Sequence, residues 1–91
     1  MTKYWEVGKK NNFGKECYKL HFDGNVVAGI VQDETDDNVY IYVSEELNVE
    51  YDTIMADDIE DAKSQIEEIL IDHWNDEIAC LKERIERFQE V

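Results

Sequence analysis

The chain has 91 residues, of which 23 are acidic and 9 are basic, and its formal net charge is −14. This length corresponds to one domain with a modest core, and the sign of the charge disfavours nucleic acid and anionic membranes and favours basic protein partners. Two cysteines are too few for a disulfide framework, and no run of about 18 apolar residues is present to span a membrane. We therefore expect a cytoplasmic protein with reduced thiols.

The first third of the chain predicts three antiparallel strands. Residues 4–9 alternate apolar and polar side chains, as a half-buried strand does, and Glu16–Phe22 is expected to be a second strand. Asp23 and Gly24 then predict a two-residue type I′ turn, because both residue types accept positive φ. This turn makes Asn25–Gln32 the third strand.

The same turn predicts the register of the hairpin. A two-residue loop pairs Phe22 with Asn25 and, counting outward, Leu20 with Val27. Directly paired residues share a sheet face, so one face is expected in the core and the other partly exposed. The expected core face holds Tyr18, Leu20, Phe22, Val27 and Val31. The expected partly exposed face holds Cys17, Lys19, His21, Val26, Ala28 and Ile30.

The middle of the chain predicts an acidic loop over residues 33–37, followed by a fourth strand over residues 38–44. Tyr40 and Tyr42 lie on one face of this strand and aliphatic residues on the other, and both faces are apolar enough to meet the core. Residues Val49–Met55 are either a short fifth strand or an extended connection.

The last third predicts one long helix. Asp57 is suited to the N-cap, and Glu60 three residues later completes a capping-box arrangement. Apolar residues recur at intervals of three and four from Ile59 to Phe88, and no glycine or proline interrupts them. The expected fold is a single α+β domain, residues 1–91. In it an antiparallel meander of about four strands (residues 1–55) precedes a long C-terminal helix (residues 56–91).

The length of this helix predicts that the sheet covers only part of it. About 34 helical residues span about 50 Å, whereas a seven-residue strand spans about 23 Å. Either the helix breaks within residues 72–76 and folds back, or its second half contacts another chain. Coiled-coil spacing favours the second option and a homodimer, although a 4-4 step after Leu70 shifts the stripe as a stutter does. The expected oligomerisation residues are Trp74, Ile78, Leu81, Ile85 and Phe88.

Motifs for metal binding and catalysis are weak. Four residues are of the types that bind structural zinc: Cys17, His21, His73 and Cys80. The two on the strand would lie about 13 Å apart and the two on the helix about 10 Å apart, too far for one ion. The loop at residues 33–37 lacks the later glycine and glutamate of an EF-hand, and no nucleophile motif is present. We expect no metal, no cofactor and no enzymatic activity.

The most unusual feature is the segregation of charge. Residues 20–62 contain 13 carboxylates and no lysine or arginine, whereas residues 1–19 contain five lysines. Such a one-sign field costs folding stability through self-repulsion, which favours a functional reason over solubility alone. Carboxylates along loops and a helix N-terminus can approximate the charges of DNA, about one per 1.7 Å of axis. The expected partner-binding residues are Asp33, Glu34, Asp36, Asp37, Glu45, Glu46, Asp57 and Asp58.

In size, absence of proline and acidity, the chain resembles the small acidic viral proteins that bacteriophages use against host defences. These include anti-CRISPR proteins and other DNA mimics, and residues 33–37 and 57–61 carry the resemblance. It implies an inhibitor that acts in the host cytoplasm and blocks the nucleic-acid-binding cleft of a basic protein such as a nuclease complex. The alternative is a small structural or adaptor protein that oligomerises through residues 74–88.

Overall fold

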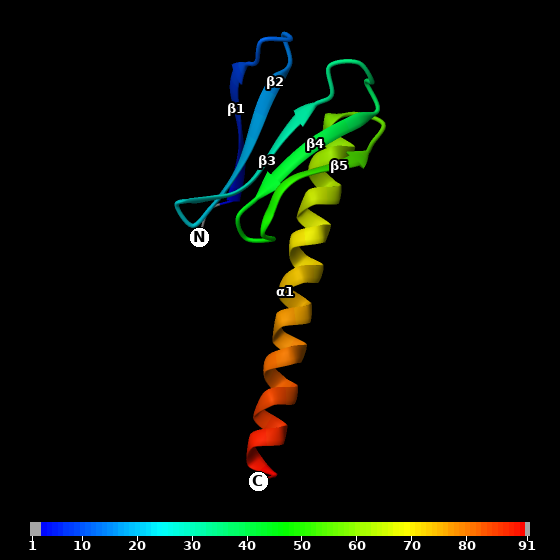
Figure 1. Ribbon diagram of the computed structural model, residues 1–91. Helices are drawn as coiled ribbons and strands as arrows, with labels where there is room; N and C mark the ends of the chain where they lie inside the picture. The colour runs from blue at the N-terminus through cyan, green and yellow to red at the C-terminus, as the bar shows by residue number, and fades with distance from the viewer. Residues whose placement is uncertain (1–2, 91) are drawn as a thin grey trace.

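A computed structural model describes residues 3–90, in which five strands form one antiparallel sheet and a single helix follows. The elements are β1 (Lys3–Lys10), β2 (Glu16–Phe22), β3 (Asn25–Gln32), β4 (Val39–Ser44), β5 (Val49–Met55) and α1 (Ile59–Gln89). The strands lie side by side in chain order, and α1 crosses one face of the sheet and continues beyond it (Figure 1). The predicted α+β meander with a C-terminal helix is confirmed. Of the two alternatives for Val49–Met55, the strand is the one observed.

The turn between β2 and β3 has the predicted geometry. Asp23 and Gly24 have φ of 51° and 82°, and a type I′ turn requires positive φ at both central positions. The flanking residues Phe22 and Asn25 form the predicted pair. Glycine adopts this conformation without a steric penalty because it has no Cβ. A local sequence signal was therefore sufficient to locate this hairpin.

A β-bulge just beyond the turn makes the predicted register wrong. Leu20 pairs with Ala28 instead of Val27, because Val27 is an additional residue on β3. Beyond the bulge the two faces of β3 are exchanged. Ala28 and Ile30, which were predicted to be partly exposed, are buried in the core. Val31, which was predicted to be in the core, lies on the opposite face and is half-buried.

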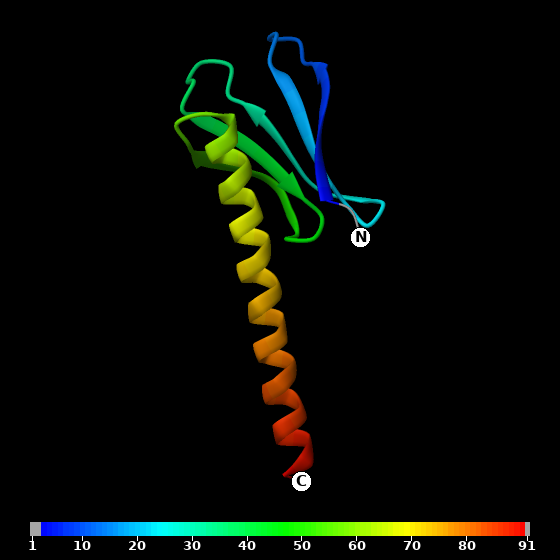
Figure 2. The same cartoon turned by 180° about the vertical axis from the view of Figure 1, so that it is seen from behind.

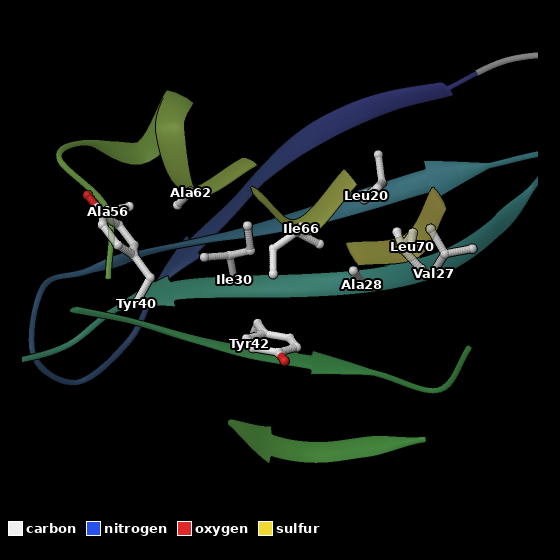
Figure 3. Packing of buried hydrophobic residues seen from close by; sticks show 10 residues of the cluster. All are labelled: Leu20, Val27, Ala28, Ile30, Tyr40, Tyr42, Ala56, Ala62, Ile66 and Leu70. Carbon is white, nitrogen blue, oxygen red and sulfur yellow. The ribbon is translucent and has the colours of Figure 1, made fainter. Parts of the chain in front are cut away.

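The core lies between the sheet and the first half of α1. Its buried residues come from three strands, the residue that follows β5 and the helix (Figure 3): Leu20, Val27, Ala28, Ile30, Tyr40, Tyr42, Ala56, Ala62, Ile66 and Leu70. On β4 it is the tyrosine face that meets the core. The small side chain of Ala28 lies on β3, the strand to which α1 comes closest, and small residues at such a crossing let the helix backbone approach the sheet.

The N-cap of the helix lies one residue later than predicted, and the helix itself begins at Ile59 instead of residue 56. Asp58, and not Asp57, is the N-cap, and its Oδ1 accepts a hydrogen bond of 2.8 Å from the backbone N–H of Asp61. Asp61 in turn accepts the backbone N–H of Asp57 at 3.0 Å, in place of the predicted pair with Glu60. The N–H of Ala56 still donates across the sheet at 2.9 Å. The acidic run allows an N-cap at Asp57 or at Asp58. Because the strand pairing continues as far as Ala56, the helix is capped at Asp58.

The helix is unbroken, and its second half leaves the sheet. Its 31 residues continue through positions 72–76 without folding back, so the alternative of a helix hairpin within one monomer is not observed. The molecule measures 58 Å along its longest axis and 26 and 20 Å along the others. Every residue from 75 to 90 is exposed, and Figure 2 shows this half projecting clear of the strands. Across residues 3–90, no helix is both long and apolar enough to cross a membrane.

Candidate acidic binding surface

Two acidic segments that are distant in the sequence meet at one end of the sheet. Residues 33–37 join β3 to β4, and residues 57–61 lead from β5 into α1. Asn38 connects them, because its C=O accepts the N–H of Ala56 at 2.9 Å and its side-chain amide donates to the Ala56 C=O at 3.2 Å. Both connections lie at the end of the sheet where α1 begins (Figure 1). We call their eight carboxylates the acidic rim: Asp33, Glu34, Asp36, Asp37, Asp57, Asp58, Glu60 and Asp61.

The rim contains six of the eight predicted partner-binding residues. The other two, Glu45 and Glu46, lie in the turn between β4 and β5, at the opposite end of the sheet. A six-residue strand separates the two ends by about 20 Å. The rim also contains Glu60 and Asp61, which belong to the acidic run at residues 57–61 but are not among the predicted partner-binding residues. The predicted residues thus do not form one continuous surface, because chain direction reverses at every turn of the meander.

Besides Asp61, which accepts the N–H of Asp57, three carboxylates of the rim also support its backbone. The Oδ2 of Asp33 accepts the N–H groups of Thr35 and Asp36, each at 3.1 Å, and the Thr35 hydroxyl at 2.8 Å. Asp36 accepts the N–H of Asn38 at 2.9 Å, and Asp58 caps α1. These short aspartate bonds are typical of turns and N-caps. The hydroxyl and the backbone N–H of Thr35 hold the pKa of Asp33 below its usual value.

Other rim carboxylates have no such role. Glu34 and Asp57 are exposed, and their side chains accept no hydrogen bond from any described residue. Asp37 is also exposed, and its Oδ1 lies 3.6 Å from the Nζ of Lys15. No backbone group is held by the side chains of Glu34 and Asp57. These two side chains are therefore the cleanest probes of a binding role.

Lysines from the N-terminal hairpin neutralise the rim only in part. Lys15 contacts Asp37, and on the helix Lys63 contacts Glu60 at 3.2 Å. Lys9 and Lys10, at the end of β1, belong to the same hairpin as Lys15. Neither makes an ion pair with any residue from 3 to 90. Eight carboxylates less two paired lysines leave a formal charge of −6 on the rim. The N-terminal hairpin thus supplies one countercharge, from Lys15, at one corner of the rim.

Carboxylates from both segments of the rim raise the pKa of Tyr40. Tyr40 is buried on β4, and this burial is the main reason that its pKa is raised. The charges of Asp58 and Asp37 raise the pKa further, because a phenolate would lie close to both carboxylates. One carboxylate comes from each segment. Their common effect on one side chain is a second sign that the two segments lie around the same point.

The predicted oligomerisation residues lie in two different environments. Trp74 is half-buried: its ring lies 6.1 Å from that of Phe22, and its Nε1–H donates to Glu46 at 3.3 Å. At least half of the surface of each of the other four is exposed: Ile78, Leu81, Ile85 and Phe88. Ile71, which is not among the predicted oligomerisation residues, is also exposed and stands three residues before Trp74. The spacing of Ile71 from Trp74 and Ile78 fits a heptad, but the count through the apolar Leu70 gave a 4-4 step instead.

The sheet face opposite α1 has a wide, open depression of about 890 Å³ across β3 and β4. Its lining includes Lys19, Glu50 and Ser44. The Ser44 hydroxyl already donates to the C=O of Val27 at 2.7 Å and accepts the N–H of Leu47 at 3.1 Å. It is therefore not available as a nucleophile. Within the described part of the chain, no three His, Cys, Asp or Glu side chains converge as metal ligands would.

No protein-family model, curated protein or solved structure matches the chain. The resemblance to phage counter-defence proteins therefore stays a prediction from size and charge. The acidic rim and the exposed half of α1 are the two features from which a function is to be inferred.

Proposed function

We propose that this protein is a non-enzymatic inhibitor that presents the acidic rim to the nucleic-acid-binding cleft of a larger basic protein. The observation that carries the proposal is the meeting of two acidic segments at one end of the sheet, where they hold a formal charge of −6. Rim carboxylates take the place of phosphates and pair with arginine and lysine of the partner. The resemblance to anti-CRISPR proteins points to a defence nuclease complex in the cytoplasm as that partner.

The hydrogen bonding of the rim supports this role. Asp33, Asp36 and Asp58 each use one carboxylate oxygen to hold a loop or the helix N-terminus. The second oxygen of each accepts no bond from the described residues. Loops held in this way lose little conformational entropy on binding, which favours affinity. The charge of the rim also accelerates the encounter with a basic cleft, in a manner that salt suppresses.

The experiment compares two double charge reversals that change the net charge equally. Glu34→Lys with Asp57→Lys alters the rim at side chains that hold no backbone group. Glu45→Lys with Glu50→Lys alters exposed carboxylates away from the rim. The wild-type protein and both variants are used to capture partners from host lysate, and the dissociation constant is then measured with the purified partner. We expect the rim variant to bind at least about tenfold more weakly and the control to bind like the wild type.

The second measurement is competition with nucleic acid. We expect the wild-type protein to displace duplex DNA or RNA from the captured partner and the rim variant to fail. Equal weakening by both charge reversals would show that only net charge matters. A captured partner that binds its nucleic acid equally well with and without this protein would refute inhibition by phosphate mimicry.

A second candidate function is assembly, in a small structural or adaptor protein. It is favoured by the exposure of Ile78, Leu81, Ile85 and Phe88 along the half of α1 that contacts no strand. Leu81→Glu and Ile85→Glu should abolish association and leave partner binding by the rim unchanged. The rim variant should show the opposite pattern.

A further inference from the structure

Apolar residues of α1 form one continuous stripe at coiled-coil spacing, and all of them are exposed except Trp74, which is half-buried. Leu70 is buried against the sheet, but the next residue, Ile71, is 54% exposed. If the heptad pattern is counted from Ile71, the 4-4 step that arises when it is counted from Leu70 disappears, and with it the stutter. The intervals become three, four, three, four and three, with isoleucine at every a position and tryptophan, leucine and phenylalanine at the d positions. We call this stripe the seam: Ile71, Trp74, Ile78, Leu81, Ile85 and Phe88.

We propose that two copies of this chain associate through the seam as an antiparallel two-stranded coiled coil. The proposal goes beyond the proposed function and does not depend on it, because the seam and the acidic rim share no residue. The helix is already held in place at its N-terminal half by the buried Ala62, Ile66 and Leu70. The projecting half is therefore presented to a second copy in a formed state, which lowers the entropic cost of association.

The sizes of the seam residues favour the antiparallel orientation. In that orientation the layers pair Ile71 with Phe88, Trp74 with Ile85 and Ile78 with Leu81 of the second copy. Every layer then combines one isoleucine with one d residue, so the layers differ less in volume than they would if each residue faced its own copy. In a parallel dimer each residue would face its own copy. Tryptophan and phenylalanine layers would then alternate with narrow isoleucine layers, which pack less evenly.

Charges beside the seam complement one another in the antiparallel dimer. Residues at g positions then face each other, so that Glu77 meets Arg84 of the second copy, and the two-fold axis repeats this pair. At the e positions Lys82 meets Asn75, which brings no like charges together. A parallel dimer would also form two pairs, between Glu77 and Lys82. The flanking charges permit both orientations, and the rest of the molecule distinguishes them.

The acidic rims favour the antiparallel orientation most strongly. Parallel helices pack about 10 Å apart, so a parallel dimer would bring two rims of formal charge −6 close together. In the antiparallel dimer the two helix N-termini lie about 60 Å apart, from the helical rise and a centre between Ile78 and Leu81. That separation exceeds the screening length of about 8 Å at physiological salt many times over. The dimer would thus carry one acidic rim at each end.

The first test is the oligomeric state by sedimentation equilibrium over a concentration series. We expect a reversible dimer for the wild-type chain. Leu81→Glu places a charge in the seam and should raise the dissociation constant at least about 100-fold. The matched control is Ala79→Glu, which adds the same charge at another exposed position of α1 and should remain dimeric. A wild-type chain that stays monomeric throughout, or equal loss of dimer in both variants, overturns the proposal.

The second test determines the orientation by disulfide crosslinking. Both native cysteines are replaced by alanine, and Ile71→Cys and Phe88→Cys are made as separate variants. In the antiparallel dimer residue 71 of one copy lies beside residue 88 of the other, while the two copies of residue 88 lie about 25 Å apart. Oxidation of a mixture should therefore give the mixed disulfide. Efficient crosslinking of Phe88→Cys to itself would show a parallel dimer and refute the proposed orientation.

Discussion

Truncation of Ile66 tests whether the first half of α1 is what holds the helix to the sheet. Ile66 has no exposed surface and lies at the centre of the core cluster (Figure 3). Ile66→Ala removes three carbon atoms, which costs about 2.4 kcal/mol in transfer free energy at about 0.8 kcal/mol each. The cavity that remains adds to this cost, and buried isoleucine-to-alanine changes typically cost about 2–5 kcal/mol. We expect the free energy of unfolding to fall by about 3 kcal/mol.

The matched control is the same change at Ile78, on the same helix. Ile78 is half exposed and contacts no strand, so Ile78→Ala creates no cavity. Alanine also has the higher helix propensity, which offsets the small loss of apolar contact. We expect the free energy of unfolding to change by less than about 0.5 kcal/mol.

Urea unfolding monitored by tryptophan fluorescence and by circular dichroism measures both variants. Low protein concentration is used so that association through the seam does not contribute. A loss of less than about 1 kcal/mol for Ile66→Ala, or equal losses for the two variants, would contradict the assignment of the core. It would mean that α1 is not held by the cluster around Ile66.

Three further predictions concern single side chains. Asp58→Ala removes the N-cap of α1 and should lower the free energy of unfolding by about 1 kcal/mol, measured by urea denaturation. Thr35→Ala removes a hydroxyl that stabilises the charged form of Asp33, so the pKa of Asp33 should rise toward its usual value in an NMR titration. Because that pKa is lowered in the folded state, the stability contributed by Asp33 is present above its usual value of 3.8 and is lost as the pH falls through the folded pKa. Glu77→Arg should weaken the dimer about tenfold in sedimentation, and adding Arg84→Glu should restore it.

Each of these predictions has its own control. Asp57→Ala should leave stability nearly unchanged, since the Asp57 side chain holds no backbone group; a loss as large as that of Asp58→Ala would move the N-cap back to residue 57. An unchanged pKa of Asp33 in Thr35→Ala would show that the backbone bonds alone account for the shift. Restoration of the Glu77→Arg dimer by Lys82→Glu, in place of Arg84→Glu, would indicate parallel helices.

Local signals in the sequence were sufficient for the elements themselves. The Asp23-Gly24 turn has positive φ at both positions, as that residue pair predicts. The long helix follows from apolar spacing without glycine or proline, and its N-cap was correct to within one residue. Such features depend on neighbours within about four positions, and those neighbours are all present in the sequence.

Register and the choice of faces depended on contacts across the sheet. Residues 26–31 are all apolar or glycine, so alternation carried no information about the bulge at Val27. Only the packing of α1 on Ala28 and Ile30 selects the register in which both are buried. The same holds for β4, where both faces are apolar and the helix covers the tyrosine face. Burial against a distant element decided each case.

The sequence by itself determined that the protein has a meander, a long helix and a segregated acidic stretch, because each is encoded in composition or short-range spacing. Only the tertiary structure decided which carboxylates share a surface. Reversal of the chain at each turn brings residues 33–37 and 57–61 together and carries Glu45 and Glu46 to the far end. It also decided which apolar residues of α1 remain for a second chain, since five strands of sheet cover only the first half of a 31-residue helix.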